Sequence, residues 1–216
     1  MNIQKIRSVW DANREHLTPN FTGHDLEEIN SRLASFYCPG PFYFYVFDFR
    51  SIEFAYMSDS FEEILGQGRE GLNIQLYLEN VHPDDLEYFS QCEQTAAKFL
   101  FEYINPAKLL DYKVSYCYRI KTADQNYRLF LHQAIGLTMD SENRLGKVLG
   151  VHSDISHITQ TNNHKISFFG INKEPSFTNI EVLKSDASVF KTDEQYNLTE
   201  REIEVLRLLS EVASSK

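Results

Sequence analysis

The chain has 216 residues, of which 42% are hydrophobic, so we expect one large domain or two small ones with a sizeable core. Its formal net charge of −10 disfavours binding of the chain as a whole to nucleic acid or anionic membranes. The cysteines are odd in number and widely spaced, which favours a reducing cytoplasm over a disulfide framework. No apolar run is long enough to span a bilayer.

Residues 1–36 are expected to be helical. Apolar side chains recur there at helical spacing in two stripes, Ile3, Ile6, Trp10 and Leu17 in the first and Leu26, Ile29, Leu33 and Phe36 in the second. The sequence CPGP at 38–41 then breaks the chain and indicates a domain boundary.

Two strands and a set of helices are predicted next. The β-rich runs FYFYVFDF and SIEFAYMS form a candidate hairpin that turns around Arg50 and Ser51. A short helix follows, with Asp59 as its expected N-cap and Gly66 as its end. A longer helix is expected within 81–104, where Pro83 suits the first helical position.

Three strands close this region. In YKVSYCYRI, which begins at Tyr112, large apolar residues alternate with smaller or charged ones, as in a strand with one buried face. The run YRLFLHQAIGL is apolar on both faces around Leu129–Leu131, and GKVLGVHSDI is the last of the three. The order of these elements indicates an α+β fold. Beyond it, ISFFGI is a candidate extra strand, and residues 172–197 read as a loop-rich linker.

The C-terminal stretch NLTEREIEVLRLLSEVASSK is typical of the start of a helical domain. Thr199 and Glu202 have capping-box spacing, and Leu198 and Ile203 are placed for a hydrophobic staple. The helix carries an apolar stripe that requires a packing partner, because an isolated helix of this length is marginal in water. The sequence supplies no such partner downstream before Lys216.

These segments carry two family resemblances. The sequences SDSFEEILG, VHPDDL, YRIKTADQNYRLF and VLGVHSDIS, in this order, resemble a PAS domain. The sequence LTEREIEVLRLLSE resembles the opening of a LuxR-type helix-turn-helix, although Val212 and Ala213 stand where that family usually has Gly-Leu. The resemblance implies a five-stranded antiparallel sheet with short helices on one face. It divides the chain into an N-terminal helical extension (1–40), a PAS sensor domain (41–158), a linker with a candidate extra strand (159–197) and an incomplete helix-turn-helix (198–216).

A ligand pocket is implied by the PAS resemblance, because such domains often enclose a ligand between sheet and helices. The expected pocket residues are Met57, Phe61, Leu65, Tyr116, Tyr118, His132 and Leu149. The sequence leaves open whether this space is a cavity or is filled by the large aromatic side chains.

No cofactor or metal ion is expected. Light-sensing PAS relatives carry Asn-Cys-Arg around their flavin, whereas this chain has Asn73, Ile74 and Gln75, so no thiol is available for a flavin adduct. Haem-binding relatives commonly use a histidine on the long helix, and residues 84–104 contain none. His132 and His152 are expected on neighbouring strands, where two hydrogen-bonded histidines are a simpler interpretation than a metal site.

The function implied by the two resemblances is that of a cytoplasmic transcription regulator, in which a PAS input controls a LuxR-type helix-turn-helix. The alternative is a PAS interaction or dimerisation module that signals to a partner protein without binding DNA. No catalytic constellation is present, so an enzyme is not expected. We expect a homodimer and a small-molecule signal. The DNA-binding fragment, a scaffold helix with Thr199, Arg201, Glu202 and Arg207, should need further helices to bind promoter DNA.

Overall fold

The computed structural model describes residues 37–182, and the fold concerns the unit that begins at Gly40. The expected N-terminal helical extension and the expected start of a helix-turn-helix lie outside the described residues. Within residues 37–182, no helix is long and apolar enough to cross a membrane.

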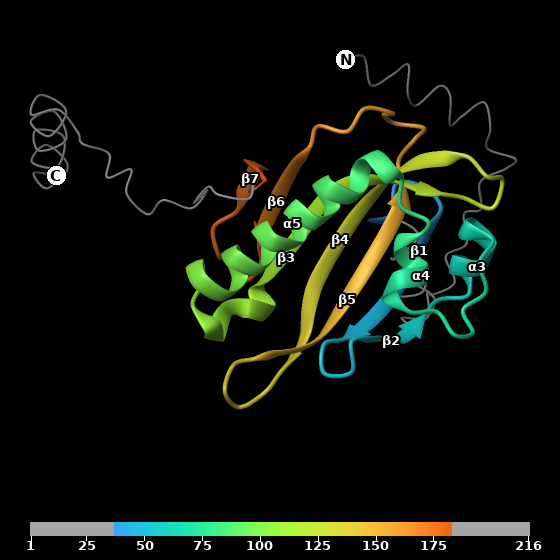
Figure 1. Cartoon of the computed structure of the whole chain (residues 1–216). Helices are drawn as coiled ribbons and strands as arrows, with labels where there is room; N and C mark the ends of the chain where they lie inside the picture. Colours follow the sequence, from blue (N-terminus) through green and yellow to red (C-terminus); the bar gives the residue numbers. More distant parts are fainter. Residues whose placement is uncertain (1–36, 183–216) are drawn as a thin grey trace, which may run out of the picture. The chain divides into compact units, whose positions relative to one another are not determined.

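An antiparallel sheet of seven strands forms the frame of the described region, in the order β2-β1-β5-β4-β3-β6-β7. Figure 1 shows the strands side by side, with β6 and β7 at one edge. Their bounds are β1 (Phe42–Asp48), β2 (Glu53–Met57), β3 (Tyr112–Lys121), β4 (Tyr127–Met139), β5 (Leu145–Asp154), β6 (Lys165–Gly170) and β7 (Phe177–Glu181). The predicted hairpin is confirmed, since β1 and β2 pair directly across a turn at 49–52.

The sheet is wider than the five strands expected from the sequence. β6 begins one residue before the candidate strand and pairs with β3, which would otherwise be an open edge. Ile166 and Phe168 of β6 are fully buried, and Phe168 stacks on Phe99 with ring centroids 3.8 Å apart. β7 lies in a segment that was predicted to be a loop. The prediction failed because the sequence of β7, FTNIE, is too polar to show the alternation typical of a strand.

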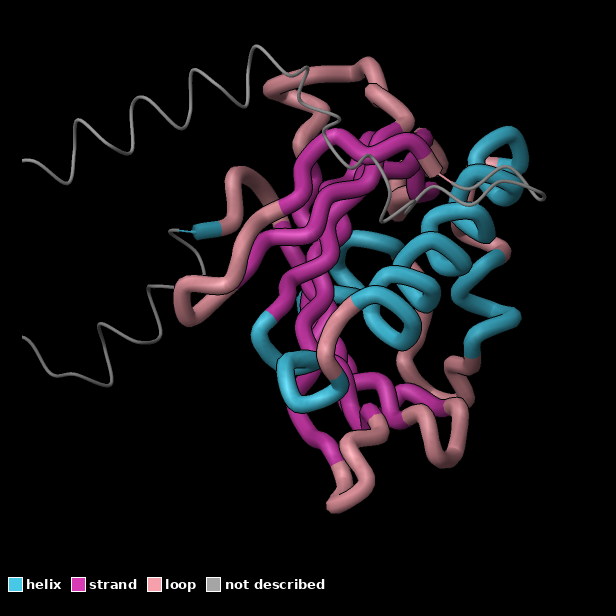
Figure 2. Tube along the Cα trace, turned by 90° about the vertical axis from the view of Figure 1, so that its left-hand side faces the viewer, coloured by secondary structure: helices cyan, strands magenta, loops and turns pink. Residues whose placement is uncertain are grey.

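The helical segments lie between β2 and β3 in the chain. They are α3 (Ser60–Leu65), α4 (Ile74–Leu78), η2 (Pro83–Asp85), α5 (Leu86–Lys98), η3 (Phe99–Tyr103) and η4 (Pro106–Asp111). The long helix α5 runs across one face of the sheet in both views (Figures 1 and 2). Gly66 ends α3 in the left-handed conformation, as predicted. Asp59 is the N-cap residue of α3, as predicted, but its carboxylate makes no cap hydrogen bond and instead pairs with Arg69 Nη1 at 2.5 Å.

The hydrophobic core lies between the helices and the inner face of the sheet. The alternation predicted for β3 is confirmed: its inner face is buried throughout, with Tyr112, Val114, Tyr116, Tyr118 and Ile120. Phe61 from α3 and Phe99 from η3 are fully buried against this layer. Burial of these large aromatic side chains is the main source of stability for the helix–sheet contact.

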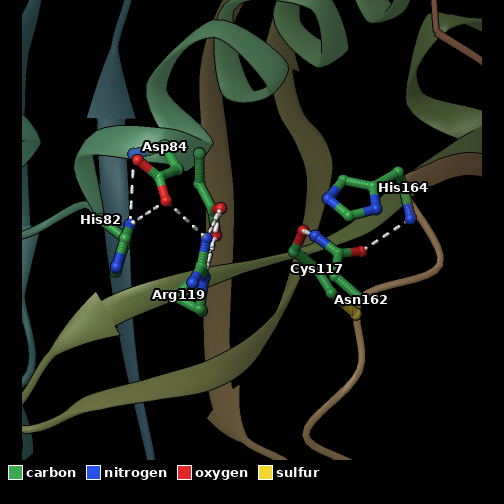
Figure 3. Close-up of polar contacts among 7 residues, drawn as sticks. His82, Asp84, Cys117, Arg119, Asn162 and His164 are labelled. Atoms are coloured by element: carbon green, nitrogen blue, oxygen red, sulfur yellow. Dashed lines mark hydrogen bonds and ion pairs between the residues drawn. The ribbon is translucent and has the colours of Figure 1, made fainter.

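Two polar contacts hold neighbouring segments against β3, and a third caps η2 (Figure 3). The buried carboxylate of Asp85 accepts hydrogen bonds from the Arg119 backbone N–H at 2.8 Å and from Arg119 Nη2 at 2.5 Å, which ties the start of α5 to β3. His82 accepts from the Asp84 backbone N–H and so caps η2. Asn162 Nδ2 donates to the Cys117 carbonyl at 2.7 Å and thereby holds the segment leading to β6 against β3.

Candidate ligand-binding site

Strands β4 and β5 place two histidines opposite each other on the inner face of the sheet. His132 and His152 are cross-strand partners, and His132 Nδ1 lies 2.9 Å from His152 Nε2, within hydrogen-bond distance. Both side chains are buried. Among residues 37–182, no group of three or more His, Cys, Asp or Glu side chains is arranged to hold a metal ion. The pair is held by a hydrogen bond between the two rings and by a bond from the Tyr118 hydroxyl to His152.

Three tyrosine hydroxyls extend this histidine pair into a buried network. Tyr118 lies on β3, and its hydroxyl is 2.6 Å from His152 Nε2. The Tyr77 hydroxyl is 2.8 Å from that of Tyr118 and 3.2 Å from that of Tyr43. The network thus connects α4, β1, β3, β4 and β5. His152 Nδ1 is its one buried atom that has no hydrogen-bond partner within the described residues.

This His/Tyr network is electrically neutral near pH 7. Burial lowers the pKa of His132 to about 3, and burial together with His132 lowers the pKa of His152 well below its usual value. Burial likewise raises the pKa of Tyr77 to about 12. The network therefore supplies hydrogen-bonding groups but no charge to the interior.

A cavity of about 220 Å³ lies beside the network, between α5 and the sheet. Its wall is mostly aromatic, with Tyr45, Phe47, Phe49, Phe54, Tyr77, Phe89, Phe101, Tyr112, Tyr116 and Tyr118. Phe49 and Phe101 are also exposed to solvent, at 48% and 56%, and so mark the side on which the cavity meets the surface. The space that the sequence left open is therefore a cavity and is not completely filled by its aromatic lining.

Glu93 is the one formally charged side chain that the described part of the chain contributes to the lining of this cavity. It projects from α5, and the Tyr116 hydroxyl donates a hydrogen bond to its Oε1. Glu93 is solvent-exposed where it lines the cavity, although many protein atoms surround its carboxylate. Desolvation raises the pKa of Glu93 above its usual value, and the bond from Tyr116 offsets part of that rise.

Three of the residues predicted for the pocket, Tyr116, Tyr118 and His132, line this cavity. Met57, Phe61 and Leu65 do not line it. They are buried in the core cluster, where Phe61 packs edge-on against Tyr43 with ring centroids 5.2 Å apart.

Leu149 is also absent from the lining. It is the cross-strand partner of Val46 and Ile135, and it lies between Gly150 and Val148 in β5. Val148 lines the cavity, so alternation along the strand places Leu149 on the opposite face of the sheet.

The sequence reasoning missed Glu93 and the helical side of the cavity. Phe89, Glu93, Ala96 and Leu100 all line it, and their spacing of three or four residues places them on one face of α5 and its extension. A carboxylate inside an apolar helical stripe is the signal that could have found this residue.

Comparison with known proteins finds one region that matches a family model. Residues 54–152 match the family model described as PAS fold. No curated protein matches the chain.

Similar solved structures include the N-terminal domain of a diguanylate cyclase with PAS/PAC sensor from Marinobacter aquaeolei, at 16% identity and TM-score 0.43, covering 54% of this chain and 96% of that one. A sensory box histidine kinase/response regulator from Burkholderia thailandensis has 16% identity and TM-score 0.42, covering 60% and 86%. A PAS domain from Colwellia psychrerythraea has 14% identity and TM-score 0.41, covering 60% and 98%. The family match shows that residues 54–152 form a PAS domain.

Proposed function

We propose that this PAS domain senses a small molecule bound non-covalently in its cavity, and that the sensing controls a LuxR-type DNA-binding output in the cytoplasm. The observation that carries the sensing function is the cavity of about 220 Å³ between α5 and the sheet, with hydrogen-bonding groups on its wall. Apolar cavities with a few convergent polar groups are the usual form of a small-molecule site.

The residues near the cavity favour a non-covalent ligand. Ile74 lines the cavity and stands where the light-sensing relatives have their cysteine, so it offers no thiol. The cavity is somewhat larger than the engineered cavity of about 150 Å³ that binds benzene. A ligand with one ring and a short side chain is therefore the expected size.

The DNA-binding output is supported by the sequence of residues 198–211, LTEREIEVLRLLSE, which has the capping box and apolar stripe of the first helix of a LuxR-type helix-turn-helix. These residues lie outside the described part of the chain. The rival function is that of an interaction module that signals to a partner protein.

A homodimer is part of this proposal, because two-fold operators are read by two-fold proteins. The outward face of β1 and β2 offers an apolar surface for it, since Phe44 stacks on Tyr56, with ring centroids 5.5 Å apart, and Tyr56 is 49% exposed. Light scattering at tens of micromolar should give twice the protomer mass. A monomer at that concentration would contradict the dimer.

The test of the DNA-binding function uses the product of the whole reading frame and its own promoter DNA in a mobility-shift assay at moderate salt. We expect sequence-dependent binding that is lost when residue 198 and everything after it are deleted. The variant Ala134→Leu, which fills the cavity from β4, should retain DNA binding but abolish the change of reporter expression with growth conditions. Failure of the undeleted protein to bind DNA would favour the interaction module instead.

A further inference from the structure

The chemistry of the cavity wall limits the class of ligand that the cavity can bind. This inference rests on the proposed sensing function. Among residues 37–182, the lining contains one carboxylate, Glu93, and neither lysine nor arginine. His132 also lines the cavity, but its burial keeps it neutral. A bound molecule therefore meets a wall whose formal charge is negative when Glu93 is ionised.

Glu93 has unused bonding capacity. Tyr116 donates to Oε1, while Oε2 has no hydrogen-bond partner within residues 37–182. No basic side chain of the described residues contributes to the pKa of Glu93. A carboxylate that has no counter-ion among the described residues can form a charge-assisted hydrogen bond with a cation placed in the cavity.

The aromatic wall suits the same kind of ligand. Phe89 lies edge-on to Tyr118, at 5.2 Å between ring centroids, and Tyr116 stacks on Tyr118 at 5.7 Å, so several rings surround the space near Glu93. Aromatic rings attract organic cations through their negative faces, and they also pack against an apolar body. The chain-wide charge of −10 adds a long-range attraction for cations.

We infer that the ligand of this cavity is a small organic cation, an amine or quaternary ammonium with a one-ring apolar body, and that Glu93 is its counter-ion. The charged nitrogen binds Glu93 Oε2, and the body packs against the aromatic wall. Tyr116 acts as a positioning residue, because its hydrogen bond fixes the carboxylate from the sheet side.

The test uses three probes with the same body and different charge: 2-phenylethylamine, which is a cation at pH 7, 2-phenylethanol, which is neutral, and phenylacetate, which is an anion. Binding to the full chain is measured by calorimetry, with thermal shift at probe concentrations up to 10 mM. We expect the amine to bind about 10- to 100-fold more tightly than the alcohol, the range for a charge-assisted hydrogen bond. Phenylacetate should be the weakest.

The variant Glu93→Gln keeps the shape and a hydrogen-bond acceptor but removes the charge. In it the amine and the alcohol should bind within about twofold of each other, a residual difference far below the ~10-fold effect of one charge-assisted bond. The matched control is Glu87→Gln, the same charge change on the exposed side of α5, which should leave the preference for the amine unchanged. Thermal melts of both variants establish that they are folded.

The outcomes separate this inference from the proposed function. Tighter binding of the alcohol or of phenylacetate by the wild-type chain would overturn the inference while leaving small-molecule sensing in place. An amine preference that persists in Glu93→Gln would also overturn it. Binding of none of the three probes at 10 mM would contradict both the cation site and the cavity as a one-ring ligand site.

Discussion

Two carboxylates on the same helical segment have opposite surroundings. Asp85, at the start of α5, receives bonds from the backbone and the guanidinium of Arg119. Glu93, two turns further along, has the Tyr116 hydroxyl as its one hydrogen-bond partner among the described residues. Although burial by itself would raise it, the bonds from Arg119 hold the pKa of Asp85 below its usual value. Desolvation raises the pKa of Glu93.

The difference distinguishes a structural carboxylate from one available to a ligand. A buried charge that contributes to stability is paired and fully hydrogen-bonded, as Asp85 is. Glu93 faces a cavity with a free oxygen, so its ionised form lacks a partner in the described protein. Carboxylates like Glu93 are candidates for functional sites, because their shifted pKa is not explained by an ion pair that stabilises the fold.

The largest expected loss of stability comes from removing the carboxylate of Asp85. Asp85→Ala leaves the Arg119 backbone N–H and guanidinium without their acceptor, and we expect a loss of about 2–3 kcal/mol in the free energy of unfolding. The figure lies at the low end for a buried pair because Arg119 is partly exposed. Urea denaturation measures it. Asp84→Ala, which removes a carboxylate 4.0 Å from the same guanidinium, is the control and should cost much less.

A smaller loss of stability is expected when the neutral His/Tyr network is disrupted. This network provides a comparison with the two carboxylates, because its buried polar groups carry no charge. Tyr118→Phe removes the hydroxyl that contacts both His152 and Tyr77, and should cost about 1–2 kcal/mol of unfolding free energy. Tyr56→Phe, on the exposed outer face, should change stability by no more than about 0.5 kcal/mol. Equal losses for the two variants would show that the buried network has no special role.

The pH dependence of stability should have opposite signs at the two carboxylates. The folded-state pKa of Asp85 is lowered, so its contribution is present above its unfolded pKa of about 4 and is lost as pH falls through the folded value. The folded-state pKa of Glu93 is raised, so its contribution is present below an unfolded pKa of about 4 and is lost as pH rises through the folded value.

Glu93→Gln should therefore gain stability relative to the wild type as pH rises above about 4. Denaturation midpoints measured from pH 4 to pH 8 check this, with Glu87→Gln as the control. A constant difference between Glu93→Gln and the wild type across that range would contradict a raised pKa.

The sequence predicted those parts of the fold that depend on local patterns. The inner face of β3 followed from strict alternation, and Gly66 followed from the need for a left-handed residue at a helix end. β7 could not be predicted, because FTNIE owes its strand conformation to pairing with β6 rather than to its own pattern.

The site was predictable on the sheet side and not on the helix side. Tyr116, Tyr118 and His132 could be predicted because side chains alternate between the two faces of a strand. This alternation assigns all three to the inner face of the sheet, where they line the cavity. Met57, Phe61 and Leu65 were misplaced because apolar character alone does not distinguish a packed core from a cavity wall. Whether Glu93 has a counter-ion depends on three-dimensional neighbours, which no local pattern records.

The most direct test of the role of Glu93 is a titration of its carboxyl carbon by NMR, with and without saturating 2-phenylethylamine. We expect a pKa above the usual range for glutamate in the free protein, and a clear decrease when the amine binds, because the cation stabilises the ionised form. A pKa in the usual range without ligand, or one that does not fall on amine binding, would contradict this role of Glu93.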